Sequence, residues 1–578
     1  MNLAGLWNKR QIPDIKVVPD WYVVLGGIDA SNYDVTYTSE DFFVVKTQAV
    51  KSDNSRFIVV GDIWLSNRSY LLQLSHLNKK YTDKEIVAHL WQMKGEECLN
   101  LLEGMFSLCV WDNKERHLYL VRDAVGCRTL YYTNSGKMCV IAPRMATLLP
   151  NHSQKLDLVA LRDYLCCAFV PGEQTLWQNV RELSVGMVLQ MESSGEEINY
   201  INEKLFWEAK ENIQNAQESL IWHGKQLRQL LDRVVQEYLP ANQPVGVYLS
   251  GGLDSSCITA LAAKFHNQPV HTYSIHFGEK CPNELEFSGL VAQHCKTQHH
   301  ILEITPNDMW DKLPKVMSYL DDPIGDPLTV PNYLLGKIAR EKAGVILNGE
   351  GGDPCFGGPK NQPMLLNRLY SGVKNTEDNL VTNYVNSFKK CSSYLPQLLK
   401  PEVLTKVQEK DFVFADYLYR NENYLNRLMT INIKFKGADH ILTKVNNMTV
   451  ANNLSGRSPL FDRRVVEMAM QIPPQYKLAG AQEKAVLKQA VLDVLPREII
   501  ERPKSGMMVP VQYWFKNIWQ RRAKSLLLNK NAEIAPYLNQ DLIKQWLNYR
   551  GDAWQRYGVK LWLLLSLEIW LQVQKKNR

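Results

Sequence analysis

The stretch Val245–Ser256, VGVYLSGGLDSS, constrains the fold of this chain more than any other. Its first five residues are typical of a buried strand, and Ser256–Lys264 has the spacing and composition of a helix. Between them, Ser250–Ser255 is too small and too polar to belong to a core. A loop that joins the end of a strand to the start of a helix presents free backbone N–H groups to an anion. We therefore predict a phosphate-binding loop here, and the alternative is an ordinary strand-to-helix turn.

The bulk properties limit the class of protein. A length of 578 residues leaves room for two or more domains. The 67 basic and 60 acidic residues give a net charge of +7 without the concentrated basic stripe of a nucleic-acid surface. The 11 cysteines show no CxxC pair and no Cys/His spacing suited to zinc. We expect a reducing compartment and no nucleic-acid partner.

No segment has the pattern of a secretion signal or a membrane span. The opening residues lack a charged region followed by an apolar one. The apolar stretch Leu561–Leu571 contains Glu568 and is too short to cross a bilayer. We predict a cytoplasmic protein without a membrane partner, in which this stretch is a buried helix.

The two halves of the chain differ in pattern, and we place their boundary near residue 210. Residues 1–210 contain short strands joined by polar turns, with helices near 82–102 and 156–166, which predicts an α+β domain with antiparallel sheets. In residues 211–578, strands alternate with helices, as in a doubly wound α/β domain with a parallel sheet. Helices dominate after about residue 360, so this domain is expected to have a helical C-terminal part.

A second glycine-rich stretch, Asn348–Asp353 (NGEGGD), follows another predicted strand. Asp254 and Asp353 would then lie at the carboxyl ends of strands in one sheet, where they could share a Mg²⁺ ion bound to phosphate oxygens. Glu350 has no phosphate-binding rationale and suits a general base. For each acid alone, the alternative is a loop carboxylate that caps a helix.

A third segment, Glu501–Gly506 (ERPKSG), carries Lys504. A lysine in a short polar loop is usually solvated, but near an adenylating site it could neutralise charge in a transition state. The string GxxxxGK[ST] is absent, which excludes a standard P-loop kinase or GTPase.

The order of these motifs resembles the asparagine synthetase family, and the resemblance covers nearly the whole chain. SGGLDSS is similar to the pyrophosphate loop (PP-loop) of ATP-pyrophosphatases, and four strings follow it in the family's order: DDPIGDP from Asp321, NGEGGD, RSPLFDRRVVEMA from Arg457, and RPKSG. In the first half, LEGMFSLCVWD, LVRDAVGCRTLYY and FVPGEQTLWQNVREL are similar to strings of the family's glutaminase domain. This implies a glutaminase-type (Ntn-type) αββα sandwich followed by a PP-loop domain.

The resemblance also implies a role for each matching residue. Ser250, Gly251, Gly252, Asp254, Ser255 and Ser256 match the pyrophosphate loop, and Leu249, Ile275, Asn348 and Gly349 match positions that line the adenosine of ATP. Asp254 and Asp353 match the magnesium ligands, Glu350 the acid implicated in proton transfer, and Lys504 the lysine that steadies adenylation. The family converts a carboxylate and ATP to an acyl-adenylate, which an amine then attacks to give an amide and AMP.

The first half departs from the family where a glutaminase needs its functional residues. The family uses an N-terminal cysteine as nucleophile, whereas this sequence has Asn2 and its first cysteine is Cys98. The glutamine-holding string NGEIYN is replaced by Val60–Leu65 (VGDIWL), and the arginine-bearing string by Phe43–Thr47 (FVVKT). We expect a degenerate glutaminase domain.

Without glutamine hydrolysis, either free ammonia enters or the substrate carries its own amine. The opening LAGLWN is similar to the lasso-peptide macrolactam synthetases (cyclases) of the family, and Glu350 distinguishes the chain from β-lactam synthetases, which place tyrosine there. We therefore expect a lasso-type cyclase acting on a peptide carboxylate, with a leader-recognition protein and a protease as partners. Pro354, Cys355 and Pro359 replace the usual residues on the acceptor side, so the substrate stays open.

Four alternatives remain on the sequence alone. They are an asparagine synthetase that uses glutamine or ammonia, a β-lactam-type synthetase, a tRNA-modifying PP-loop enzyme and a non-catalytic scaffold. The diffuse charge and the missing CxxC pair disfavour the tRNA-modifying enzyme. The retained motif residues disfavour the scaffold.

Overall fold

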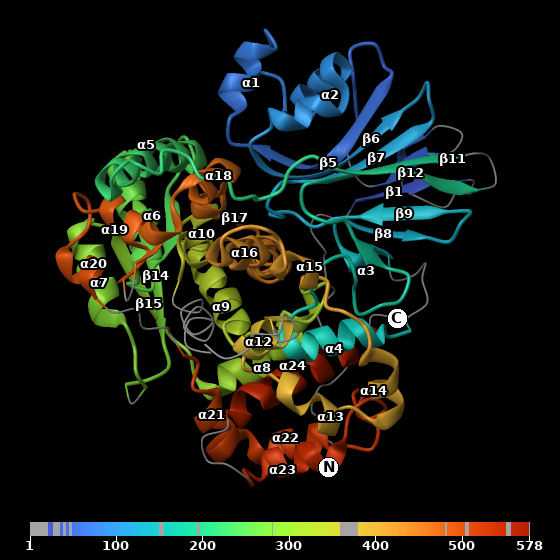
Figure 1. Ribbon diagram of the computed structural model, residues 1–578, viewed down its shortest axis with the longest axis vertical. Coiled ribbons are helices and arrows are strands. Elements are labelled where there is room, and N and C mark those ends of the chain that lie inside the picture. Colours follow the sequence, from blue (N-terminus) through green and yellow to red (C-terminus); the bar gives the residue numbers. More distant parts are fainter. Residues whose placement is uncertain are drawn as a thin grey trace.

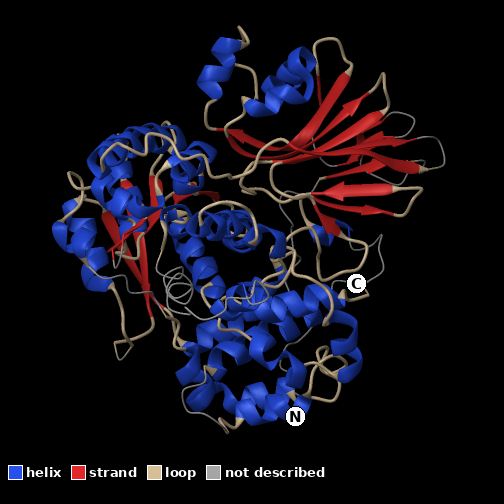
Figure 2. Ribbon diagram, viewed as in Figure 1, coloured by secondary structure: helices blue, strands red, loops and turns tan. Residues whose placement is uncertain are grey.

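The structure is a computed structural model that describes residues 21–26, 35–38, 42–45, 49–148, 155–193, 197–279, 281–358, 380–479, 482–502, 508–550 and 556–576. Strands gather in two places, a pair of sheets formed by the first 205 residues and a separate sheet of the second half, with helices around and below them (Figures 1 and 2). Lys504, Pro359, the opening LAGLWN and part of Phe43–Thr47 lie outside the described residues.

The first half forms two antiparallel sheets. Their strand orders are β10-β8-β9-β1-β3-β2 and β12-β11-β7-β6-β5-β4. The strands of the first sheet are β1 (Tyr22–Leu25), β2 (Val35–Thr38), β3 (Phe42–Val45), β8 (Tyr131–Asn134), β9 (Cys139–Ala142) and β10 (Arg181–Glu182). Those of the second are β4 (Val50–Lys51), β5 (Phe57–Leu65), β6 (Gly104–Asp112), β7 (His117–Arg122), β11 (Met187–Ser193) and β12 (Ile198–Leu205). Strands β6 and β7 form one antiparallel hairpin, and β8 and β9 form another.

Alternating side chains of β5 explain why helices and sheets stack in layers here. Ile58 and Val60 pack between the two sheets, whereas Phe57 and Val59 face the helices α1 (Arg68–Leu74) and α2 (Asp83–Lys94). Successive residues of a strand point to opposite faces, so a strand apolar on both faces must be covered on both. On the outer side of the other sheet lie α3 (Met145–Leu148) and α4 (Leu158–Cys167). The predicted α+β organisation with antiparallel sheets is therefore present.

The second half is built on a parallel sheet with strand order β15-β14-β13-β16-β17. Its strands are β13 (Val245–Tyr248), β14 (Val270–His276), β15 (Gln298–Glu303), β16 (Val345–Leu347) and β17 (Ser455–Arg457). From β13 the chain moves outward through β14 to β15, then returns to place β16 on the other side of β13. Ligands of such sheets bind where the order reverses, beyond the carboxyl ends of the strands. Here that point lies between β13 and β16.

Helices cover both faces of the parallel sheet. Val345 and Leu347 of β16 pack with α5 and α6, whereas Ile346 packs on the opposite face with the core that contains α8, α9 and α24. The helices beside the sheet are α5 (Leu220–Tyr238), α6 (Leu253–Phe265), α7 (Leu285–His294), α8 (Pro306–Ser318), α9 (Thr329–Ala339) and α10 (Gly352–Phe356).

After residue 380 the described chain is mainly helical, as expected. The α-helices are α12 (Leu380–Ser387), α13 (Leu395–Leu398), α14 (Pro401–Val407), α15 (Ala415–Leu418), α16 (Tyr424–Ile431), α17 (Thr443–Val450), α18 (Arg463–Gln471), α19 (Ala485–Ala490), α20 (Arg497–Glu501), α21 (Val511–Trp514), α22 (Gln520–Leu527), α23 (Gln540–Leu547) and α24 (Tyr557–Lys576). A π-helix, Asn432–Leu442, joins α16 to α17. A short hairpin, β18 (Leu478–Ala479) and β19 (Gln482–Glu483), precedes α19.

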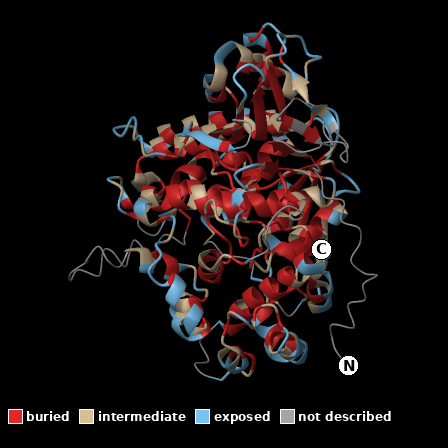
Figure 3. Cartoon of the chain, turned by 90° about the vertical axis from the view of Figure 1, so that its right-hand side faces the viewer, coloured by how far each residue is buried: buried red, intermediate tan, exposed pale blue. Residues whose placement is uncertain are grey.

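The apolar stretch Leu561–Leu571 lies in α24 and is buried, which confirms that prediction. Glu568, in its middle, accepts hydrogen bonds from the backbone N–H groups of Glu533 (3.1 Å) and Ile534 (3.0 Å), so this buried carboxyl is not left unpaired. Buried residues run through both halves of the molecule (Figure 3). Among the described residues, none of the helices combines the length and the apolar character needed to cross a membrane.

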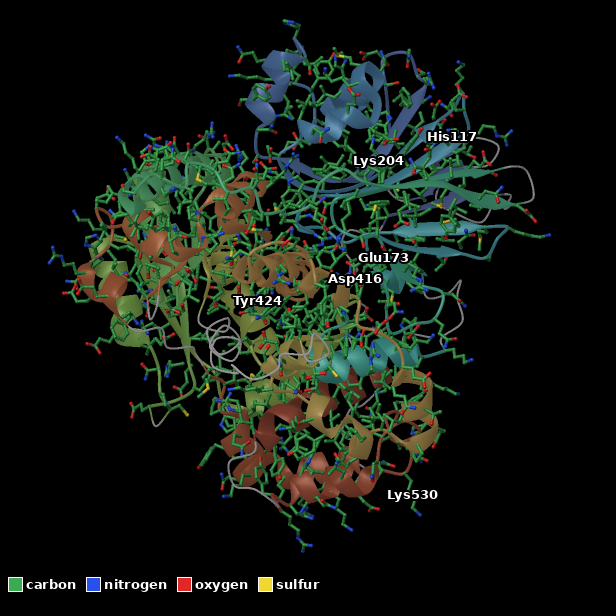
Figure 4. The ribbon with its side chains drawn as sticks, viewed as in Figure 1. His117, Glu173, Lys204, Asp416, Tyr424 and Lys530 are labelled. Atoms are coloured by element: carbon green, nitrogen blue, oxygen red, sulfur yellow. The ribbon has the colours of Figure 1, made fainter. Side chains whose placement is uncertain are left out.

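The two halves are joined by hydrogen bonds to acids of the second half. The first half donates to each of three acids through a backbone N–H: Met145 to Asp321 (2.8 Å), Leu176 to Asp322 (2.9 Å) and Gly172 to Asp439 (2.7 Å). We call Asp321, Asp322 and Asp439 the interface acids. In Figure 4, the labelled Glu173 and Asp416 lie between the sheets of the first half and the helical part.

Candidate active site

The loop after β13 leaves the start of α6 open to a ligand. Gly252 is the N-cap of α6 and supplies no side-chain hydrogen bond to the first turn. Backbone N–H groups of a first turn lack partners within the helix and attract anions. Beside them, the hydroxyls of Ser250 and Ser255 lie 3.1 Å apart, and Ser250 N–H donates to Ser255 Oγ (3.2 Å). This geometry suits a phosphate group.

The loop after β16 lies directly against the loop after β13 because its glycines have no side chains. A Cβ on Gly349 would lie 2.4 Å from Ser255 N, and one on Gly352 would lie 2.2 Å from Asp254 Cγ. Asn348 holds the loop in place, since its Oδ1 accepts hydrogen bonds from Glu350 N–H (3.0 Å) and the Ser458 hydroxyl (2.9 Å). The two predicted motifs therefore meet at the reversal of the strand order.

Lys484, which the sequence analysis did not identify, joins the two acids of these loops. Its Nζ lies 2.5 Å from Asp254 Oδ2 and 2.5 Å from Asp353 Oδ1, and its side chain is 2% exposed. Burial lowers the pKa of Lys484, but the two carboxylates outweigh this effect and raise the pKa above its usual value. The lysine is therefore a permanent cation between the two loops.

The two acids fit a divalent cation that also binds phosphate. Each acid has a carboxylate oxygen 2.5 Å from the Lys484 Nζ, so one cation can contact both acids. In addition, Asp254 Oδ1 is buried and has no hydrogen-bond donor among the described residues. The described residues contain no cluster of three or more His, Cys, Asp or Glu that could hold a metal. Mg²⁺ is commonly held by one or two carboxylates, with phosphate and water completing its shell.

These loops open into a cavity of about 440 Å³. Ten of the predicted site residues line it, namely Leu249, Ser250, Gly252, Asp254, Ser255, Ile275, Asn348, Gly349, Glu350 and Asp353. Gly251 and Ser256 do not line it, and Ser256 is fully buried. Leu249, Ile275 and Leu335 form an apolar part of the wall, which suits a flat base more than a phosphate.

Four charged or titratable groups of the cavity lining interact with one another. Lys444 Nζ lies 2.6 Å from Asp326 Oδ2, and His440 Nε2 lies 3.4 Å from the same oxygen. Burial opposes ionisation of Asp326, but Lys444 and His440 hold the pKa of this carboxyl well below its usual value. Glu350 is affected differently, because burial raises its pKa although Lys444 opposes the shift. Asp326 therefore stays ionised, and Glu350 has the higher affinity for a proton.

Lys504 lies outside the described residues, but Arg502, two positions earlier, is described. Arg502 Nη1 donates to the Gly251 carbonyl (3.0 Å), and its Nη2 binds Glu284 Oε1 (2.6 Å). The RPKSG segment therefore starts in direct contact with the phosphate-binding loop. The role predicted for Lys504 stays a prediction.

Lowering the pH is expected to destabilise the protein through His440. Burial lowers the pKa of His440 to about 4, with Asp326 opposing and Lys444 adding to the shift. As the pH falls from 6.5 to 4, His440 binds a proton in the unfolded chain but not in the folded chain. The contribution of the neutral His440 to the free energy of unfolding is therefore fully present above pH 6.5 and is lost as the pH approaches 4. We expect a loss of about 3 kcal/mol from this group.

Urea unfolding at pH 7.0, 5.5 and 4.5, followed by circular dichroism, measures this loss. His440→Phe removes the titrating group, so the variant should lose less of its free energy of unfolding over this interval than the wild type. Equal losses in the two proteins would contradict the assignment.

In the first half, the string VGDIWL lies on β5 and contacts the second half. Asp62 forms an ion pair with Arg128 Nε (2.8 Å), and Arg128 Nη1 donates to Asn446 Oδ1 (3.2 Å). The ring of Trp64 packs edge-on against Tyr238 (5.0 Å) and lies 4.2 Å below the guanidinium of Arg457. Asp62 and Trp64 thus take part in the contact between the halves.

Comparisons with known proteins cover both halves. A family model described as asparagine synthase matches residues 226–572, and one described as a glutamine amidotransferase domain matches residues 47–207. Glutamine-hydrolyzing asparagine synthetase 1 of Bacillus subtilis is 26% identical over 527 residues, which cover 86% of this chain and 82% of that protein. Glutamine-hydrolyzing asparagine synthetase 3 of the same organism is 25% identical over 540 residues, covering 87% and 84%. Among solved structures, the glutamine phosphoribosylpyrophosphate amidotransferase of B. subtilis is 13% identical, and the match covers 43% of this chain and 59% of that one. Its TM-score of 0.21 shows only a weak structural likeness.

Proposed function

Since the chain belongs to the asparagine synthase family of ATP-dependent ligases, we propose that it forms an amide within a peptide. A carboxylate of the substrate is activated as an acyl-adenylate and then attacked by an amine of the same molecule, without hydrolysis of glutamine. The product is a macrolactam of the lasso-peptide type. The substrate is a precursor peptide, and a leader-recognition protein and a protease are the proposed partners.

The residues of the cavity divide this work. The loop from Ser250 to Ser255 holds the β- and γ-phosphates, and the wall with Leu249 and Ile275 holds the adenosine. Asp254 and Asp353 fit Mg²⁺, which when bound supplies positive charge to the departing pyrophosphate. Glu350 takes the proton that the attacking amine releases. Lys504 steadies the adenylation transition state, as the family resemblance implies.

The ion pair between Asp62 and Arg128 is the observation that carries the proposal that glutamine is not used. Asp62 is the acid retained in the string that holds glutamine in the family. Here its carboxylate lies 2.8 Å from a guanidinium that is tied to Asn446 of the second half. Because one carboxylate oxygen is engaged in this contact, Asp62 offers fewer acceptor sites to a glutamine amine, which supports the proposal.

The described cysteines of the first half also lack the environment of a nucleophile. Cys98, Cys109, Cys127, Cys139, Cys166 and Cys167 are all buried. Burial raises the pKa of Cys98 to about 12 and raises the pKa values of the other five well above the usual value. Because the thiolate is the reactive form, these thiols are inert near neutral pH. This supports a degenerate glutaminase-like first domain, for which we retain residues 1–210, with the ligase domain in 211–578.

A second candidate is an asparagine synthetase that takes ammonia or glutamine. It is favoured by the relatives named above, which are asparagine synthetases and align with most of both chains. A β-lactam-type synthetase is a third candidate, and Glu350 is the residue that disfavours it.

Exchange of labelled pyrophosphate into ATP distinguishes these candidates. The purified protein is assayed with Mg²⁺ and one of three substrates: aspartate with ammonium, aspartate with glutamine, or synthetic peptides that carry a free N-terminus and an internal Asp or Glu. We expect exchange with the peptides only, together with a product that has lost one water molecule. Exchange with aspartate and formation of asparagine would support the second candidate instead.

A further inference from the structure

The π-helix Asn432–Leu442 forms one wall of the cavity. Asn432, Lys436 and His440, spaced every four residues, all line the cavity, and Lys444 of the next helix continues the row. A π-helix is rare and is frequently found at functional sites. Lys444 of this wall interacts electrostatically with Glu350, so the row reaches the predicted general base.

The first half of the chain holds this wall from outside. Phe169 stacks on the ring of His440, with ring centroids 5.4 Å apart and planes inclined by 10°. The neighbouring Asp439 accepts a hydrogen bond from Gly172 N–H (2.7 Å). Phe169 is 2% exposed, so its ring is fixed by packing. The orientation of the His440 imidazole is therefore set by the first half.

The surroundings of His440 determine which nitrogen carries its proton. Nε2 is buried and lies 3.4 Å from Asp326 Oδ2, close enough for electrostatic attraction but without a regular hydrogen bond among the described residues, and this carboxylate is also bound to Lys444. The negative charge of this carboxylate favours the N–H of a neutral imidazole on Nε2, the nitrogen that faces it. The lone pair then lies on Nδ1, where it can accept a hydrogen bond. Lys436 and Lys444 lie close enough to His440 to disfavour a second proton on the ring.

We propose that His440 contacts the attacking amine of the substrate and orients it through a hydrogen bond to Nδ1, with Phe169 as a positioning residue. This rests on the proposed function. The nitrogen lone pair attacks the carbonyl carbon of the acyl-adenylate and the C–N bond forms. The bond from that carbon to the phosphate oxygen breaks, and AMP leaves with the electron pair. One proton of the nitrogen passes to Glu350, while another N–H stays directed at His440.

The two half-reactions separate this role from a structural one. His440→Phe keeps an aromatic ring against Phe169 but has no acceptor, and His440→Leu is a smaller variant for use if the first fails to fold. Each is compared with the wild type in ATP–pyrophosphate exchange, which reports adenylation, and in amide formation, which reports transfer. The probes are the synthetic peptides described above and aspartate with ammonium. His294→Asn, an exposed histidine outside the cavity, is the control.

We expect exchange within about 3-fold of the wild type and amide formation reduced about 10- to 100-fold, the effect of one hydrogen bond in a buried site. Phe169→Leu should show the same pattern with a smaller loss, because the ring of His440 remains but is less well fixed. Unchanged amide formation in both His440 variants would overturn the inference while leaving the proposed function intact. Equal loss of exchange and amide formation would also overturn it. Absence of exchange or of amide from every probe in the wild type would instead contradict the proposed function.

Discussion

Replacing Lys484 by methionine is expected to reduce ATP–pyrophosphate exchange by about 10³-fold, the upper range for loss of one preorganised charge in an active site. The Lys484 ammonium lies 2.5 Å from a carboxylate oxygen of both Asp254 and Asp353. Without it, the site loses one positive charge beside the phosphates, and Mg²⁺ alone must offset the charge of the two acids. The free energy of unfolding should also fall, by about 3 kcal/mol, because a buried ion pair loses one partner.

Mg²⁺ provides a second measurement on the same variant. If the two carboxylates hold this ion, Mg²⁺ should raise the free energy of unfolding of Lys484→Met more than that of the wild type, because the ion no longer competes with the ammonium. Lys264→Met is the matched control, since Lys264 lies in the last turn of the same helix as Asp254 and forms an exposed pair with Asp232 at 3.9 Å. Exposed pairs contribute little, so this variant should retain exchange and stability. Normal exchange in Lys484→Met would show that the lysine has no part in nucleotide chemistry.

Glu350→Gln is expected to impair amide formation much more than adenylation. Burial raises the pKa of Glu350, so its carboxyl is a better proton acceptor than an ordinary glutamate. The amide has the same shape but cannot take a proton. Exchange should therefore persist, while amide formation falls about 10²- to 10⁴-fold, the usual contribution of a general base.

Trapping with hydroxylamine tests the position of the block in Glu350→Gln. An acyl-adenylate that forms but is not aminolysed should accumulate and yield a hydroxamate when hydroxylamine is added. Asn348→Ala is a useful comparison, because it removes the hydrogen bonds that hold the same loop and should impair both half-reactions. If Glu350→Gln loses exchange to the same degree as amide formation, its role is in nucleotide binding and not in proton transfer.

The sequence predicts those parts of the site that follow directly from strand ends. Asp254 and Asp353 come from short glycine-rich segments after apolar runs, and the fold brings both within 2.5 Å of one nitrogen. Lys484 was missed because it lies in Gln482–Leu487 (QEKAVL), a segment that reads as an ordinary amphipathic helix start. Its backbone φ of +55° is unusual for lysine, but this conformation leaves no mark in composition.

The cavity wall formed by the π-helix Asn432–Leu442 could also not be predicted from the sequence. Nothing in Lys434–His440 (KFKGADH) indicates a π-helix, and the positions that line the cavity depend on that irregular winding. In the sheet, β15 has no buried run and β17 has only three residues, so neither gives a strand signal. Both are strands because the neighbouring strands β14 and β16 leave backbone groups to pair.

The interface acids bear on whether the first half could be removed from this chain. Deleting the first 210 residues would remove the N–H donors of Asp321, Asp322 and Asp439 at once and leave three carboxylates without them. The cost of such a deletion is the loss of these buried hydrogen bonds together with the apolar contacts between the two halves. Under the proposed function, in which glutamine is not hydrolysed, the first half is still needed to cover these surfaces of the second half. On that proposal, the amidotransferase-like module serves as a structural support of the ligase domain.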